Sequence, residues 1–184
     1  MDEEVDVIDE NDNLLGFTKM KSQVHKDGDW HRAAHLWVII GNKILMQKRA
    51  PTKYTFPNCF DVACAGHVIA GESYEKTIER ELEEELGIKA NKKDFIYTGK
   101  RKLISVEKGK VKSREIVAVY IYRFRGKLSD IKVQEEEISE VKLFGINELK
   151  DLIKTKPGLF AGPEKAEEKD YFWEMIDQIE DIIK

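Results

Sequence analysis

The 184-residue chain contains few cysteines and prolines, no long apolar run and no excess of basic residues. Its two cysteines, Cys59 and Cys64, form neither a CxxC pair nor a four-ligand zinc pattern, so we expect reduced and buried thiols. No apolar stretch approaches the roughly 20 residues that span a bilayer. The first ten residues, MDEEVDVIDE, are acidic and lack the basic and apolar regions of a signal peptide. These absences predict a cytoplasmic protein with no membrane partner.

The charge balance argues against another class of partner. Lysines and arginines number 31 against 35 aspartates and glutamates, for a net charge of -4 at pH 7. Proteins that bind nucleic-acid polymers normally carry a basic surface, so we expect no such partner. A small anionic molecule remains possible, because a bound metal ion supplies positive charge locally. With 41% hydrophobic residues the chain can bury a sizeable core, and its length fits a single domain over 1–184.

The most informative segment is glutamate-rich, residues 66–88, GHVIAGESYEKTIERELEEELGI. Five glutamates lie between positions 79 and 85, and like charges at i,i+4 disfavour an ordinary helix. At about 100° per residue, the part from Ser73 to Leu86 nevertheless separates into faces. One face is an apolar stripe of Tyr74, Ile78, Leu82 and Leu86, and the sector beside it holds Glu81, Glu84 and Glu85.

These three carboxylates at the edge of the apolar stripe predict a metal site. Residues three and four apart on a helix have Cβ atoms about 5–6 Å from each other, so the three side chains form an oxygen-rich cluster. Hard divalent cations prefer oxygen ligands, and Mg²⁺ or Mn²⁺ would relieve the repulsion between the carboxylates. The alternative is a solvated acidic face, since charge runs usually lie on protein surfaces.

The spacing of the whole segment favours the metal site. Gly66 is followed after five residues by Glu72, and after seven more by 80–88, RELEEELGI. This pattern resembles the complete signature of the Nudix hydrolases. The resemblance implies a loop, helix and loop in which Glu81, Glu84 and Glu85 bind metal and serve catalysis. It also implies that Glu72 and Arg80 brace the loop and that Gly71 and Gly87 permit the turns.

The order of the other elements predicts an α/β (α+β) fold with a mixed β-sheet sandwiched between α-helices, which is also the Nudix-type arrangement. Residues 1–28 should form an N-terminal hairpin and loop, and 33–40 and 43–49 a central hairpin around Gly41-Asn42. Further strands are expected at 100–107, 111–124 and 138–144, followed by a helix capped by Asn147. The final helix, 163–184, carries an apolar stripe that either packs across the sheet or forms a homodimer contact.

Four residues outside the glutamate cluster are candidates for substrate contact. Trp30 and His31 precede an apolar strand and can line the site, with Trp30 able to stack on a base. Arg49 ends a strand, and its planar guanidinium suits phosphate. His67 follows Gly66. For each histidine a structural role is the alternative.

A general base is also required for hydrolysis. Glu81 or Glu85, oriented by the metal, is favoured over Glu137, which belongs to an acidic run before a predicted strand. The acidic run alternatively serves only as a charged strand entry.

A second resemblance concerns the isopentenyl-diphosphate isomerases, which share this fold. It rests on 30–33 (WHRA), Phe56-Pro57 and 64–67 (CAGH). In those isomerases, histidines matching His31 and His67 join a glutamate resembling Glu115 to hold a metal. His25 is either a further ligand or a surface loop residue. The isomerase reaction also uses a cysteine, and the aligned position here is Ala65, which cannot carry a proton.

The sequence therefore predicts a metal-dependent Nudix hydrolase that cleaves a diphosphate linkage in a small nucleoside-diphosphate-type substrate by water attack on phosphorus. The alternatives are an isopentenyl-diphosphate isomerase, disfavoured by Ala65, or a prenyl-diphosphate hydrolase. A non-catalytic nucleotide-binding module is the weakest alternative, because all three carboxylates of the glutamate cluster are present.

Overall fold

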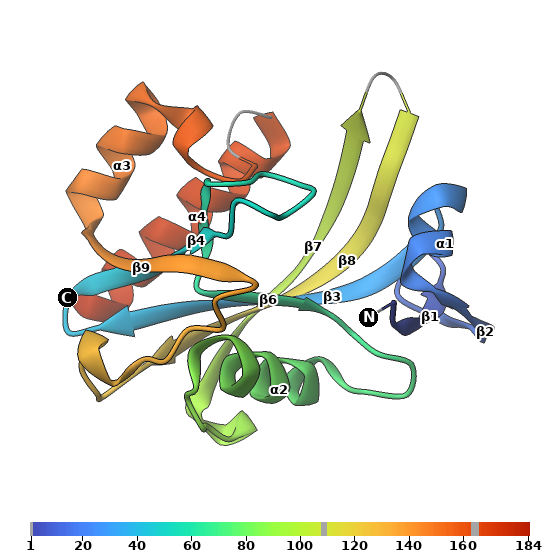
Figure 1. Cartoon of the computed structure of the whole chain (residues 1–184), viewed down its shortest axis with the longest axis horizontal. Helices are drawn as coiled ribbons and strands as arrows, with labels where there is room; N and C mark the ends of the chain where they lie inside the picture. The colour runs from blue at the N-terminus through green and yellow to red at the C-terminus, as the bar shows by residue number, and fades with distance from the viewer. Residues whose placement is uncertain (1, 108–109, 163–165) are drawn as a thin grey trace.

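The computed structural model describes residues 2–107, 110–162 and 166–184 (Figure 1). The described strands are β1 (Glu4–Ile8), β2 (Leu14–Met20), β3 (Trp30–Ile40), β4 (Lys43–Arg49), β5 (Phe60–Val62), β6 (Cys64–His67), β7 (Phe95–Glu107), β8 (Lys110–Arg123) and β9 (Ile138–Gly145). The α-helices are α1 (Lys21–Asp27), α2 (Tyr74–Leu86), α3 (Ile146–Thr155) and α4 (Ala166–Ile183). Residues 163–165, where the last helix was expected to begin, lie outside the described residues.

The sheet is organised around β3. On one edge, residues 30–39 of β3 pair in parallel with residues 114–123 of β8, and β7 pairs antiparallel with β8. On the other edge, β3 pairs antiparallel with β1, β6 and β4 at successive positions along its length. Strand β4 then carries β9 and β5. Because β6 and β4 pair with different parts of the same edge of β3, the sheet splits between these two strands. Side chains of α2, described below, lie at this split.

The two faces of β3 belong to different helical layers. Alternate side chains of a strand point to opposite faces, so Trp37 and Ile39 pack under α3 and α4, whereas Leu36 and Val38 pack against α2. Figure 1 shows α2 beneath the sheet and α3 and α4 above it. The predicted mixed sheet between helices is confirmed.

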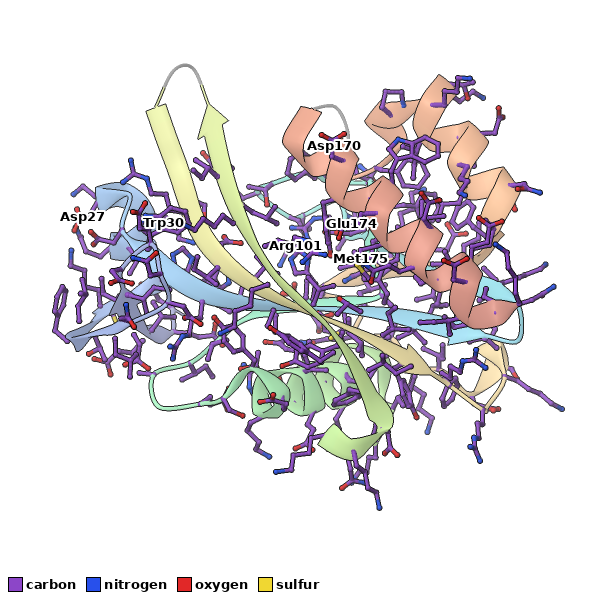
Figure 2. All side chains as sticks on the ribbon, turned by 180° about the vertical axis from the view of Figure 1, so that it is seen from behind. Asp27, Trp30, Arg101, Asp170, Glu174 and Met175 are labelled. Carbon is purple, nitrogen blue, oxygen red and sulfur yellow. The ribbon has the colours of Figure 1, made fainter. Side chains whose placement is uncertain are left out.

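Helix α4 buries its apolar stripe within the chain. Phe172, Met175, Ile176 and Ile179 are at most 3% exposed and belong to the core on the α4 face. Arg101 of β7 reaches over to Glu174 of α4, with Nη2 2.5 Å from Oε1 (Figure 2). The packing interpretation of this helix is therefore correct, and its stripe is not available for a dimer contact. No helix among the described residues is long and apolar enough to cross a membrane.

Two local predictions differ from the structure. The loop that was expected after the N-terminal hairpin contains the short helix α1, which ends at Gly28 in the left-handed conformation. Helix α3 begins at Ile146 with Gly145 as its N-cap, so Asn147 lies inside the first turn and is not the cap. The Glu148 carboxylate accepts the N–H of Gly145 at 3.3 Å, and this contact takes the place of an Asn147 cap.

Candidate active site

Helix α2 has defined ends and a buried stripe. The Ser73 side chain accepts the N–H of Lys76 at 3.3 Å, and Gly87 closes the helix with φ 66°. Ile78, Leu82 and Leu86 are fully buried against the sheet. This packing sets the rotation of the helix, and the neighbouring sector of glutamates consequently faces the division between β4 and β6.

Glu85 connects the two sides of that division. Its Oε2 accepts a hydrogen bond from Gln47 Nε2 of β4 at 3.4 Å, and the backbone of Ala65 in β6 is close enough to lower the pKa of the same carboxyl group. The residue is only 7% exposed. A carboxylate held in this way has a fixed orientation, as a metal ligand or general base requires.

Glu81 lies against the backbone of β6. A Cβ placed on Gly66 would be 2.1 Å from Glu81 Oε1, which is far inside van der Waals contact. The absence of a side chain at Gly66 therefore allows this carboxylate to approach the strand.

Arg80 ties the loop before α2 to the helix. Its Nη1 donates to Glu81 at 2.7 Å and to Glu84 at 3.3 Å, and its Nη2 contacts Glu72 and the His67 carbonyl, both at 3.4 Å. Thr77 donates a further hydrogen bond to Glu72 at 2.9 Å. Planar guanidinium geometry permits several such contacts at once, which an ammonium group does not match.

The electrostatics of the cluster favour a bound cation. Burial raises the pKa of Glu85 well above its usual value, and the nearby charges of Glu81, Glu137 and Asp61 raise it further. Burial also raises the pKa of Glu81 to about 7, although the Arg80 ion pair opposes this. Buried carboxylates that repel one another ionise readily only when positive charge is close. This set of carboxylate oxygens fits a divalent cation with oxygen ligands.

The other two predicted acidic residues lie at the border of the cluster. The Glu84 side chain is 55% exposed and contacts Arg80. Glu137 precedes β9 and forms an ion pair with Lys53. It is close enough to Glu85 to raise the pKa of that carboxyl, but its own oxygen is engaged by the lysine.

A second cluster of ligand-type side chains lies on the α4 face of the sheet. It combines His25 of α1, His31 of β3, His67 of β6 and Glu115 of β8, with one ligand atom of each within 4.8 Å of all the others. Nε2 of His67 is 3.4 Å from Nε2 of His25 and 3.5 Å from Glu115 Oε1. His25, for which a surface loop position was the alternative, thus lies within the cluster.

The donor set of this second cluster also fits a divalent cation. His31 Nδ1 is 3.3 Å from the Asp29 carbonyl, which can only accept, so Nε2 is left facing Glu115. That nitrogen is buried and has no hydrogen-bond partner among the described residues. Burial, with the neighbouring His67 and His31, lowers the pKa of His25 to about 4, so its imidazole is neutral and able to coordinate. Imidazole and carboxylate ligands together suit several divalent transition metals.

Arg49 and Trp30 have protein partners in the structure. Arg49 donates to the Thr55 carbonyl at 3.0 Å, to Thr55 Oγ1 at 3.2 Å and to Asp61 at 3.1 Å, and so holds the 50–59 loop to β5. Lys102 lies over the Trp30 ring, 5.8 Å from its centroid. Figure 2 shows Trp30 beside Asp27 of α1, at the end of the sheet that carries the histidines. Substrate contact by Arg49 and Trp30 stays a prediction.

Two polar residues next to Glu85 were absent from the sequence-based site. Gln47 is 3% exposed and directly follows the buried apolar run Ile44, Leu45 and Met46 of β4, and a buried polar residue at that position was a usable signal. Asp61 is placed near Glu85 by the pairing of β5 with β4, which no local sequence pattern indicates.

Comparison with known proteins agrees with this geometry. The NUDIX domain family model matches residues 29–169. An uncharacterised Nudix hydrolase of Clostridium acetobutylicum is 39% identical over 169 residues, covering 88% of this chain and 80% of the relative. A solved structure from Deinococcus radiodurans, 23% identical, superposes with a TM-score of 0.65 over 84% of this chain and 90% of that one, and supports the fold alone.

Two further relatives bear names that describe reactions. An isopentenyl-diphosphate Delta-isomerase of Photorhabdus laumondii is 31% identical over 166 residues, covering 88% of each chain. A prenyl-diphosphate phosphatase of Methanosarcina mazei is 31% identical over 160 residues, covering 84% of this chain and 86% of the relative. With the family model matching most of its length and a signature helix of the expected geometry, the chain belongs to the Nudix hydrolase family.

Proposed function

We propose that this Nudix hydrolase cleaves a diphosphate linkage in a small molecule by attack of water on phosphorus, with Mg²⁺ or Mn²⁺ held by Glu81, Glu84 and Glu85. The observation that carries the proposal is the pair of buried carboxylates, Glu81 against Gly66 and Glu85 between β4 and β6. Their raised pKa values make the cluster unfavourable to ionise without a cation. A bound divalent ion would neutralise charge on the phosphoryl oxygens and lower the pKa of a coordinated water.

The protein groups then supply position and a proton acceptor. Phosphoryl transfer depends mainly on alignment and charge stabilisation, so rigid carboxylates are an advantage. Glu85 is the stronger candidate for the general base, because burial and the hydrogen bond from Gln47 fix its carboxylate. Glu137 is weaker in this role, since Lys53 occupies one of its carboxylate oxygens.

The second cluster extends the proposal to the substrate. His31 and His67 were expected to contact substrate, and their grouping with His25 and Glu115 supports a second cation that would bind the diphosphate. A nucleoside diphosphate and a prenyl diphosphate share this group, so both belong in the substrate panel. The named prenyl-diphosphate phosphatase relative supports including the second. Trp30 is available for stacking, and Arg49 for phosphate contact if the 50–59 loop rearranges.

Isomerase activity is the competing outcome. The histidine cluster and the isomerase relative favour it, but the position aligned with the isomerase cysteine is Ala65. Cys64 does not replace it, because its side chain lies on the α2 face and burial raises the pKa of its thiol well above the usual value. A buried neutral thiol on the wrong face cannot exchange a proton with substrate.

The deciding experiment measures product release. Purified protein with Mg²⁺ or Mn²⁺ is incubated with nucleoside diphosphates, sugar nucleotides, dinucleotides and isopentenyl, geranyl and farnesyl diphosphates, and phosphate or monophosphate products are quantified. We expect at least one substrate to be hydrolysed and Glu85→Gln to abolish turnover. The control is Glu79→Gln, because Glu79 lies on the same helix and its Oε1 accepts the Lys92 N–H instead. Deuterium exchange into isopentenyl diphosphate without phosphate release would favour the isomerase, and tight binding without products would favour a non-catalytic module.

Three broader expectations accompany this proposal. The substrate is a small molecule and not a nucleic-acid polymer, the whole chain acts as one domain, and the protein works in the cytoplasm. A homodimer would have to use a surface other than the α4 stripe, which is buried.

A further inference from the structure

His35 lies on the α4 face of β3 and belongs to neither ligand cluster. It lies on the same face as Trp37, where α4 covers the sheet, but it is only partly buried. The next inward position towards the N-terminus of β3 is Ala33, followed by His31 of the histidine cluster. His35 therefore lies between the apolar core around Trp37 and the histidine cluster on this face.

Hydrogen bonds determine which nitrogen of His35 carries its proton. Trp37 Nε1 can only donate, and it donates to the Tyr171 hydroxyl oxygen at 2.9 Å. The single hydroxyl proton of Tyr171 is then free to go to His35 Nδ1, 3.0 Å away. We assign His35 Nδ1 as the acceptor, because this arrangement gives the Tyr171 proton a partner, and the proton of the neutral ring is then on Nε2. Burial lowers the pKa of His35, which agrees with a neutral imidazole.

The ionisable groups near His35 come from the surroundings of both ligand clusters. The charged or ionisable groups that act on His35 are Asp61, Glu115 and His67. Its partner across the β3–β6 ladder is Ala65, whose backbone lies close to the Glu85 carboxyl group. Directly opposed residues of an antiparallel pair share a face, so the imidazole lies beside the Ala65 methyl group. None of the described side chains accepts a hydrogen bond from His35 Nε2.

We propose that His35 contacts the substrate, donating a hydrogen bond from Nε2–H to a phosphoryl oxygen between the two ligand clusters, and that Tyr171 is the positioning residue that holds its tautomer. This inference rests on the proposed diphosphate chemistry. It adds a donor that no sequence motif indicated, on the face of β3 beside Ala65.

A neutral donor suits this position physically. A protonated histidine would repel cations bound by the neighbouring carboxylates, whereas a neutral N–H does not. Hydrogen bonds to anionic oxygens are shorter and stronger than those between neutral groups. A donor whose orientation is fixed before substrate binds needs no reorganisation during the reaction. The Trp37, Tyr171 and His35 chain provides that fixed orientation from the core side.

Nuclear magnetic resonance of ¹⁵N-histidine-labelled protein tests the contact directly. The probe is methylenediphosphonate, a non-hydrolysable diphosphate analogue, added with Mg²⁺. We expect His35 in the free protein to show the Nε2–H tautomer, and its Nε2 resonance to shift when the analogue binds. In Tyr171→Phe the ring should become a mixture of tautomers. Assignment uses the signal missing from His35→Gln.

Two substitutions separate contact from packing. His35→Gln places an amide donor near the position of Nε2, whereas His35→Asn reaches only as far as Nδ1 and keeps the Tyr171 contact. We expect His35→Asn to lower kcat/KM about tenfold to hundredfold, as loss of a hydrogen bond to a charged group implies, and His35→Gln to recover most of it. Tyr171→Phe should lower kcat about fivefold. Its matched control is Tyr120→Phe, which removes a buried hydroxyl bonded to Glu75 on the α2 face.

The outcomes are separable from those of the proposed function. If no substrate is hydrolysed but the analogue shifts the His35 resonance, the hydrolase proposal fails and the contact stands. An analogue that binds by calorimetry without moving the His35 signal would refute the contact, as would failure of the analogue to bind at all. Equal activity of His35→Asn and His35→Gln, with thermal melts like that of the unsubstituted protein, would also refute it.

Discussion

Replacing Gly66 with alanine separates the geometry of the acidic cluster from the stability of the fold. The added Cβ would lie 2.1 Å from Glu81 Oε1 and 2.3 Å from its Cδ. Ordinary contact begins at 3.4 Å, so the carboxylate must retreat by about 1.3 Å, the difference between 3.4 and 2.1 Å. The retreat also disturbs the 2.7 Å contact with Arg80. A small change in the strand thus displaces a predicted metal ligand.

The expected costs of this substitution differ in size. Glu81 is a flexible side chain, and an off-rotamer arrangement costs about 0.5–1.5 kcal/mol. For a chain of this length such a cost lowers the melting temperature by about 2–4 °C for each kcal/mol. In contrast, a misplacement of about 1 Å in a catalytic group lowers the rate about 10²-fold. We expect a nearly intact fold with severely reduced turnover.

Three measurements check this prediction. Thermal melts without metal report stability, calorimetric titration with Mn²⁺ reports affinity, and turnover uses the best substrate of the panel. The control is Gly145→Ala, because a Cβ there meets nothing within 4 Å and φ is -70°. If Gly66→Ala bound Mn²⁺ and turned over substrate like the unsubstituted protein, the close approach of Glu81 to β6 would have no role in the site.

The remaining predictions concern pH, the second cluster and Arg80. Burial raises the pKa of Glu81 from 4.5 to about 7, so its contribution to stability is complete below about pH 4.5 and is lost as the pH rises through about 7. The lowered pKa of His25 acts in the opposite direction over much of the same interval, so we expect the melting temperature of metal-free protein to fall relative to that of Glu81→Gln, and Mn²⁺ to remove this difference; parallel pH profiles of the two metal-free proteins would contradict this cause. His67→Ala should reduce the Mn²⁺ stoichiometry from two to one by titration, and an unchanged value would exclude the second site. Arg80→Lys keeps the charge but loses the planar fork, so we expect about 1–2 kcal/mol of destabilisation by chemical denaturation and a weaker metal site. Retention of full stability by this variant would show that the contacts with Glu72 and Glu81 are dispensable.

Local patterns predicted the helix and strands well because they depend on neighbours in the chain. The i, i+4 stripe of Ile78 and Leu82 required the helix to pack on one side, and the three grouped glutamates followed from the same periodicity. Gly41-Asn42 between two apolar runs placed the central hairpin correctly. The error at α3 has a local cause as well, since a glycine N-cap with a Glu148 contact competes with Asn147 for the helix start.

Long-range relations were not accessible in the same way. His25, His31, His67 and Glu115 come from four elements, and only the pairing of β3 with β6 and β8 and the position of α1 bring them together. The protein partners of Arg49 likewise depend on the path of the 50–59 loop.

By itself the sequence determined the acidic helix, its family and the general class of chemistry, because side-chain spacing on a helix is a property of consecutive residues. Only the tertiary structure decided that Glu81 reaches the backbone at Gly66, that Glu85 is buried between two strands, and that Tyr171 lies within hydrogen-bond distance of His35. Each of these depends on contacts between segments far apart in the chain. Burial and close approach, which set the pKa values and hydrogen bonds of a site, exist only once those segments have packed together.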